Sequence, residues 1–275
     1  MMKILIPVDF TEVAFNALKF AIRRYGMDAE YHVVHVYSGL ATADNPLPTD
    51  SSIQITESTE AQIEKIILDS LELEKLPENI IIRTVSGETI SSLVSISKEE
   101  DFNQAILGTR DNYDMLDRWF GTTSLGLVKK LDLPVLLIPR YSSYNKYKKV
   151  VIASDHHLKD EKLISKIKDW NQTHKAYLKF LHVRSDAEEG FVEESEQLVK
   201  TLFEEDDPEY GFEITAIKSK KVTESLLASA YNFKADLLII LAEKHSYLHT
   251  LVFQSVSKEI ILKSSIPVLF LHTES

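Results

Sequence analysis

The segment KILIPVDF (residues 3–10) decides the fold, because it recurs as KVVIASDH at 149–156. Three further segments recur in the same order: VVHVYS (33–38) as KFLHVRS (179–185), NQAILGT (103–109) as ADLLIILA (235–242), and LDLPVLLIP (131–139) as SSIPVLFLH (264–272). Repetition in an unchanged order indicates a tandem duplication. The chain is therefore expected to contain two copies of one domain.

Each copy alternates short apolar, β-branched runs with amphipathic stretches, which predicts parallel strands joined by crossover helices. The strands are apolar at nearly every position and therefore suit a sheet that is covered on both faces. Strands are expected near 2–9, 30–38, 79–86, 103–108 and 133–139, and near 148–154, 176–184, 211–218, 235–242 and 266–272. Helices of the first copy are expected near 11–25, 56–75, 88–99 and 121–131. The polar linker RYSSYNKYKK (140–149) separates the predicted domains, 1–142 and 147–275.

Composition narrows the class of partner and the compartment. The chain has 275 residues and a formal charge of -11, which disfavours nucleic acid or an anionic membrane as the main partner. It has no cysteine, so disulfides, thiolate catalysis and cysteine-ligated zinc are excluded. No run approaches the ~18 apolar residues of a membrane span, and the short apolar start does not fit a signal peptide. We expect a cytoplasmic protein.

The segment LGTRDNYDMLDRWFGTT (107–123) suggests a phosphate loop. Parallel sheets bind ligands beyond the carboxyl ends of their strands, and both Asp9 and Gly108 are expected at strand ends on that side. Gly121 and the two threonines after it are expected to open a helix, where free N–H groups favour anions. The alternative is structural: Gly108 ends a strand, a threonine caps the helix, and Asp9 satisfies turn N–H groups.

The order of elements, the start ILIPVDFTEVAFNAL and the spacing of this loop resemble the universal stress protein family in its tandem form. Nucleotide-binding members of that family end the fourth strand with Gly, two residues, Gly, nine residues, then Gly and Ser or Thr. Here the motif positions hold Gly108, Asp111, Gly121 and Thr122, so the spacing is intact and one glycine is replaced. The resemblance implies two domains, each a five-stranded parallel sheet sandwiched by helices, of the adenine nucleotide alpha hydrolase-like type.

The resemblance also implies a nucleotide site in domain one, for ATP or another adenine nucleotide, with or without Mg²⁺. The residues it implies for this site are Pro7, Val8, Asp9, Val36, Gly108, Thr109, Arg110, Asp111, Gly121, Thr122 and Thr123. Asp111 opposes such a site, since a like charge near a triphosphate costs on the order of 1–4 kcal/mol. Arg110 could compensate, and a divalent cation could bridge Asp111 to phosphate oxygens. The residues assign no catalytic group and no resident metal ligand.

The second copy is expected to have a degenerate site. It keeps Asp155 in the place of Asp9, but Ala242 stands near the first glycine position, and Gln254 and Ser255 stand at the last pair. Four histidines in this copy could be zinc ligands or polar residues of surface loops: His156, His157, His245 and His249.

Three functions remain open at this stage. The first is a cytoplasmic stress-response protein that binds an adenine nucleotide in domain one and acts through an unknown protein partner. The second is an interaction protein that binds no nucleotide and keeps only the fold. The third is a slow ATP hydrolase, although no hydrolase motif is present. In the family the fifth strands are edge strands that pair two domains, so pairing within the chain is expected and a homodimer is also possible.

Overall fold

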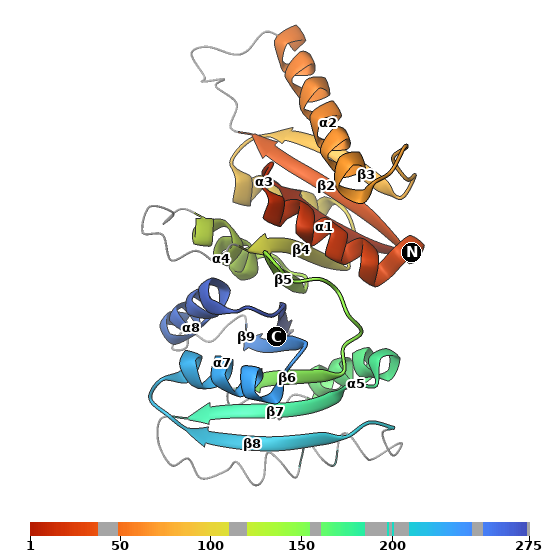
Figure 1. Ribbon diagram of the computed structural model, residues 1–275. Helices are drawn as coiled ribbons and strands as arrows, with labels where there is room; N and C mark the ends of the chain where they lie inside the picture. Colours follow the sequence, from red (N-terminus) through yellow and green to blue (C-terminus); the bar gives the residue numbers. More distant parts are fainter. Residues whose placement is uncertain are drawn as a thin grey trace. The chain divides into compact units, whose positions relative to one another are not determined.

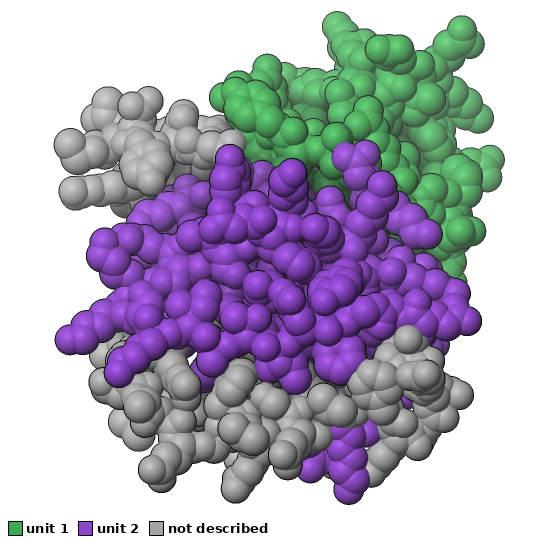
Figure 2. Space-filling model, turned by 60° about the horizontal axis from the view of Figure 1, so that its bottom comes forward, with its two compact units in different colours: residues 1–144 green, residues 145–275 purple. Residues whose placement is uncertain are grey.

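The protein divides into two compact units, residues 1–144 and residues 145–275 (Figure 2). The computed structural model describes residues 1–37, 49–109, 120–154, 161–184, 197, 200, 209–243 and 250–273. Figure 1 shows the helices and strands, most of them labelled, coloured in chain order from red to blue.

Unit one is a parallel α/β sheet. Its strands are β1 (Met2–Val8), β2 (Ala29–Tyr37), β3 (Ile80–Ser86), β4 (Gln104–Thr109) and β5 (Val135–Pro139). Its helices are α1 (Glu12–Tyr25), a short 3₁₀ turn (Gly26–Asp28), α2 (Thr49–Leu71), α3 (Thr89–Glu99) and α4 (Phe120–Lys130). The strand order is β3-β2-β1-β4-β5, with every neighbouring pair parallel.

Unit two repeats this arrangement. Its strands are β6 (Lys149–Ser154), β7 (Tyr177–Arg184), β8 (Phe212–Lys218), β9 (Leu237–Glu243) and β10 (Val268–Thr273). Its helices include α5 (Glu161–His174), α7 (Val222–Phe233) and α8 (Thr250–Lys263). Its strand order, β8-β7-β6-β9-β10, is that of unit one with each strand replaced by its repeat, and every neighbouring pair is parallel. The predicted fold class is confirmed.

Helix α2 is the main departure from the expected boundaries. It was expected over 56–75 but runs from Thr49 to Leu71. Its end is set by Glu72, whose backbone has φ 55, a left-handed conformation that stops the helix. The predicted start at residue 56 was wrong because the polar residues up to Ser52 were interpreted as loop, whereas in the structure residues 49–55 are already helical.

Helices α1 and α3 cover opposite faces of the unit-one sheet. The hydroxyl of Tyr31 donates to the carbonyl of Gly26 at the end of α1, at 2.7 Å. The next residue, His32, packs its ring against Phe102, which follows α3, with ring centroids 4.9 Å apart. Because successive side chains of a strand point to opposite faces, these two contacts assign the two helices to different faces.

The duplication extends to single hydrogen bonds that join strands. The side-chain oxygen of Asn103 accepts a hydrogen bond from the backbone N–H of Lys3 at 2.8 Å, and the backbone N–H of Asn103 donates to the Lys3 carbonyl at 2.9 Å. In unit two, Asp236 accepts from Lys149 N–H at 2.9 Å and donates its own N–H to the Lys149 carbonyl at 2.8 Å. The same pair of bonds thus fixes the first strand of each unit beside the fourth.

Candidate functional site

The predicted site residues of unit one gather at the carboxyl edge of the sheet. The chain leaves β1 toward β2 on one side and leaves β4 toward β5 on the other, so the strand order reverses between β1 and β4. Open parallel sheets bind ligands at such a reversal. Asp9 directly follows β1, and Gly108 and Thr109 end β4. This edge is therefore the candidate site.

Asp9 has a structural role through one carboxylate oxygen, while the other has no partner among the described residues. Its Oδ1 accepts the Thr11 N–H at 3.3 Å and the Thr11 hydroxyl at 2.5 Å, which closes the turn before α1. Thr11 in turn caps α1 by accepting the N–H of Ala14 at 3.4 Å. Within the described ranges no partner is found for Oδ2, and Asp9 is exposed. One carboxylate therefore satisfies the turn and offers an acceptor at the candidate site.

A phenylalanine and a histidine form a contact beside Asp9. Phe10 has φ 61, in the left-handed region, and its ring lies edge-on to His35 with centroids 4.7 Å apart. His35 Nδ1 lies 2.8 Å from the carbonyl oxygen of Val8. Sequence reasoning missed His35, although His35 and His182 occupy the same position in the repeated segments VVHVYS and FLHVRS. That repetition was the available signal. Val36, the next residue of β2, is half-buried.

Gly108 is required by packing. A Cβ at this position would lie 2.2 Å from the carbonyl oxygen of Val13 and 2.9 Å from the amide nitrogen of Ala14. These atoms belong to the first turn of α1, which crosses β4 at that point. The glycine therefore permits the close approach of one backbone to another. This reason holds with or without a phosphate, and it differs from the interpretation that Gly108 only ends a strand.

The segment 107–123, which was predicted to be a phosphate loop, is described at its two ends. Gly121 and Thr122 belong to the first turn of α4, which begins at Phe120, so their helical position agrees with the prediction. In this turn the backbone N–H groups have no partner within the helix. Arg110 and Asp111 lie outside the described residues.

A second carboxylate lies near the same edge, at the end of β3. Glu88 caps α3 by accepting the N–H groups of Ile90 at 3.1 Å and Ser91 at 2.7 Å. The hydrogen bonds from Ser91, followed by the one from Ile90, lower the pKa of Glu88. Glu88 is therefore a negatively charged helix cap at neutral pH, and both of its carboxylate oxygens are bonded to the first turn of α3.

Little of the corresponding edge of unit two is described. Ala242 lies in β9, and Gln254 and Ser255 lie in α8. Asp155 and the four histidines considered as zinc ligands lie outside the described residues. In the part of the chain that the structure describes, no group of three or more potential ligand side chains could hold a metal ion.

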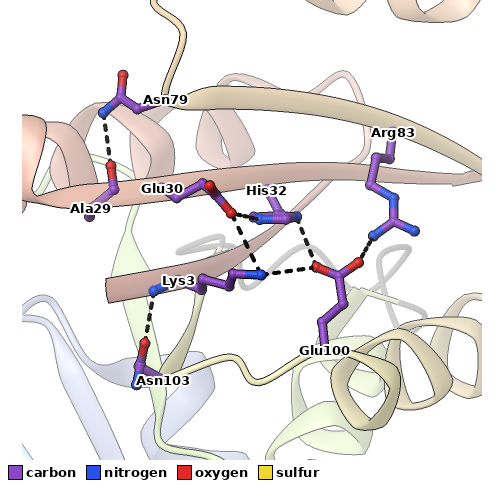
Figure 3. Close-up of polar contacts among 8 residues, drawn as sticks. All are labelled: Lys3, Ala29, Glu30, His32, Asn79, Arg83, Glu100 and Asn103. Atoms are coloured by element: carbon purple, nitrogen blue, oxygen red, sulfur yellow. Dashed lines mark hydrogen bonds and ion pairs between the residues drawn. The ribbon is translucent and has the colours of Figure 1, made fainter. Parts of the chain in front are cut away.

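A cluster of charged side chains lies at the opposite, amino edge of the unit-one sheet (Figure 3). His32 Nε2 lies 2.5 Å from a carboxylate oxygen of Glu30, and its Nδ1 lies 3.5 Å from one of Glu100. The ammonium of Lys3 lies 3.9 Å from each of these two carboxylates, and Arg83 pairs with Glu100. Two cations and two anions thus surround one buried imidazole. Because the cluster lies at the amino edge of the sheet, it is not part of the candidate site at the carboxyl edge, and its position indicates a structural role.

Replacing Glu100 by alanine is expected to destabilise unit one by about 1–2 kcal/mol, since it leaves Arg83 and Lys3 each without one carboxylate partner. Urea denaturation at low and high salt measures the effect, and the loss is expected to shrink at high salt because screening weakens the pairs. The neighbouring Glu99→Ala is the control, because the one contact found for Glu99 within the described residues is a hydrogen bond that it accepts from Ser95 on the helix surface. Equal losses for the two variants would contradict the cluster's role.

None of the helices in the described ranges is both long and apolar enough to span a membrane.

Comparisons with known proteins identify the family of this chain. The sequence profile of the universal stress protein family matches residues 1–139 and again residues 146–272. A search of curated protein sequences gave no significant match.

Solved structures match over nearly the whole chain. A universal stress protein from Archaeoglobus fulgidus DSM 4304 matches with a TM-score of 0.72 and 15% identity, covering 98% of each chain. A protein from Pseudomonas aeruginosa UCBPP-PA14 with the same family description matches with a TM-score of 0.60 and 11% identity, covering 99% of this chain and 93% of its own. At these identities the likeness shows the fold.

A shorter match is the universal stress protein from Archaeoglobus fulgidus in complex with dAMP. It covers 46% of this chain and 98% of its own, with a TM-score of 0.33 and 15% identity. That score is too low to bear on the ligand of this chain. The family match, in contrast, spans both units in succession. The chain therefore belongs to the universal stress protein family, in the form that carries two such domains in tandem.

Proposed function

We propose that this chain is a cytoplasmic stress-response protein that binds ATP or another adenine nucleotide in domain one and acts through a protein partner. The observation that carries the proposal is the position of Asp9 and Gly108 beside the reversal of the strand order between β1 and β4. Asp9 directly follows β1, and Gly108 lies at the end of β4. The preserved spacing to Gly121 and Thr122, in the first turn of α4, supports it.

The described groups suggest a division of roles. Asp9 Oδ2 is an acceptor for donors on the sugar or base, and the backbone near Pro7, Val8 and Val36 would border the base. The N–H groups of the first turn of α4, from Gly121 to Thr123, would donate hydrogen bonds to phosphate oxygens, together with the backbone near Thr109. Arg110 would neutralise part of the phosphate charge. Mg²⁺, if bound together with the nucleotide, would bridge Asp111 to phosphate oxygens.

Replacing Asp111 by glycine is expected to strengthen ATP binding about tenfold, because it removes a like charge and restores a bare backbone at the motif position. Isothermal titration calorimetry of the full chain with ATP, with and without Mg²⁺, measures the change. The control is Asp114→Gly, which removes the same charge from the same loop at a position outside the motif.

Two outcomes would count against this account. If both variants gain affinity equally, the effect is one of net charge and the motif position has no special role. If the wild-type protein and the Asp111→Gly variant both give no heat at millimolar ATP, the proposed function is wrong.

The second candidate function is an interaction protein without a nucleotide. A specific observation favours it: Gly108 is explained by the close approach of α1, and Asp9 by its bonds to Thr11, without any ligand. In this case the fifth strands, β5 and β10, would serve domain pairing or a homodimer, and the domain limits 1–142 and 147–275 would bound two structural modules. Timed release of ADP from ATP tests the remaining possibility, a slow hydrolase.

A further inference from the structure

We infer that His35 is a specificity-determining residue of the domain-one site, which together with Asp9 selects a ligand that presents hydrogen-bond donors, such as the exocyclic amino group of adenine. The inference rests on the proposed function and adds a residue that neither the sequence motif nor the family comparison assigns.

The hydrogen bond of the ring fixes its tautomer. His35 Nδ1 lies 2.8 Å from the carbonyl oxygen of Val8, and a carbonyl oxygen can only accept. Nδ1 must therefore carry the proton. In a neutral imidazole the other nitrogen, Nε2, then carries a lone pair and is an acceptor.

The ring is also held in place at the candidate edge. His35 is paired in register with Val8, the last residue of β1, and Asp9 follows immediately. The ring of Phe10 lies edge-on to the imidazole, at 4.7 Å and an interplanar angle of 64°. Phe10 reaches this contact through a left-handed backbone, which residues other than glycine, asparagine and aspartate rarely adopt. A strained residue that fixes a ring next to a ligand-binding edge is typical of a functional position.

Two acceptors therefore belong to residues at the end of β1, Asp9 directly after the strand and His35 on β2 in register with Val8. Asp9 uses Oδ1 for the turn, and within the described part of the chain neither Asp9 Oδ2 nor His35 Nε2 has a hydrogen-bond partner. A base that faces this pair with an amino group can satisfy the acceptors. A base with a carbonyl oxygen at the same position would face these acceptors with a further acceptor. Its binding would then be weaker by at least the free energy of the hydrogen bond that the amino group makes.

The test compares ATP with inosine triphosphate, in which a carbonyl replaces the amino group of the base. The wild-type chain is expected to bind ATP about tenfold more tightly, the effect of one hydrogen bond to a partly buried acceptor. His35→Phe keeps a ring for Phe10 to contact but has no ring nitrogen, so the two nucleotides should bind this variant within about twofold of each other. His182→Phe, the equivalent change in domain two, is the control and should keep the wild-type preference.

The outcomes separate this inference from the function on which it rests. Equal binding of the two nucleotides by the wild-type chain, or an unchanged preference in His35→Phe, overturns the role of His35 and leaves nucleotide binding intact. Failure of the wild-type chain to bind either nucleotide at millimolar concentration overturns both. A readout independent of any variant is the ¹⁵N spectrum of the histidine rings: we expect His35 as the Nδ1–H tautomer, and an Nε2–H tautomer would overturn the inference.

Discussion

Replacing Gly108 by alanine is expected to destabilise domain one by about 3 kcal/mol, the upper range for overpacking, because the added methyl group meets a backbone that cannot rotate away. The Cβ would lie 2.2 Å from the Val13 carbonyl oxygen and 2.5 Å from its carbonyl carbon. Relief requires α1 to move off β4, and α1 buries Phe15, Leu18 and Phe20 against the core. Urea denaturation followed by circular dichroism, with hydrogen exchange of each domain, measures the loss.

The matched control is Gly126→Ala in α4. A Cβ at Gly126 would lie 2.4 Å from Cδ1 of Ile90, which is the far end of a flexible side chain. Alanine also favours a helix over glycine by about 1 kcal/mol, so the net change should stay within about 1 kcal/mol. If Gly108→Ala were as mild as Gly126→Ala, the close approach of α1 to β4 would not be the reason for glycine at position 108.

Replacing Asn171 by leucine is expected to destabilise domain two by about 3 kcal/mol, because it leaves two buried backbone groups without partners. Asn171 is fully buried, accepts the N–H of Ala176 at 2.9 Å and donates to the carbonyl of Ala176 at 2.9 Å. These two bonds hold the turn from α5 into β7, in which Lys175 has φ 51. Leucine is larger than asparagine, so no cavity forms, and its extra bulk at this buried position adds an overpacking cost to the loss of the hydrogen bonds.

A tryptophan in α5 provides the signal for this measurement. Trp170 precedes Asn171, and its ring lies 4.5 Å from that of His174, so its fluorescence reports on domain two once Trp119 is replaced by phenylalanine. The exposed neighbour Gln172→Ala is the control and should change stability by less than about 0.5 kcal/mol. A loss for Asn171→Leu no larger than for Gln172→Ala would show that the turn does not depend on Asn171.

The inner strands of both domains could be predicted from sequence because they are buried on both faces. Runs such as residues 4–8 and 150–153 are apolar at nearly every position, which leaves little ambiguity about their structure. The start of α2 could not be predicted, because residues 49–52 are polar and the next apolar residues, Ile53 and Ile55, are two positions apart, which is not a helical spacing. Its helical form continues the turns that place Ile63 and Ile67 in the core.

The residues of the candidate site were predicted in part. Asp9 and the two ends of the loop follow from strand ends and motif spacing, which are local properties of the sequence. The packing reason for Gly108 depends on where α1 crosses β4, and the role of His35 depends on the register between β1 and β2. Neither the crossing nor the register is encoded in a local pattern. The same holds for the charged cluster, in which Lys3 and Glu100 meet from positions far apart in the chain (Figure 3).

The central claim is that one of the two domains, and not both, has kept a nucleotide site. Equilibrium dialysis of the full chain against millimolar ATP, with the bound nucleotide counted per chain, tests it most directly. The account predicts that one nucleotide binds per chain. The Asp9→Ala substitution in domain one should abolish this binding, and the Asp155→Ala substitution in domain two should leave it unchanged. Two nucleotides per chain, or none, would contradict it.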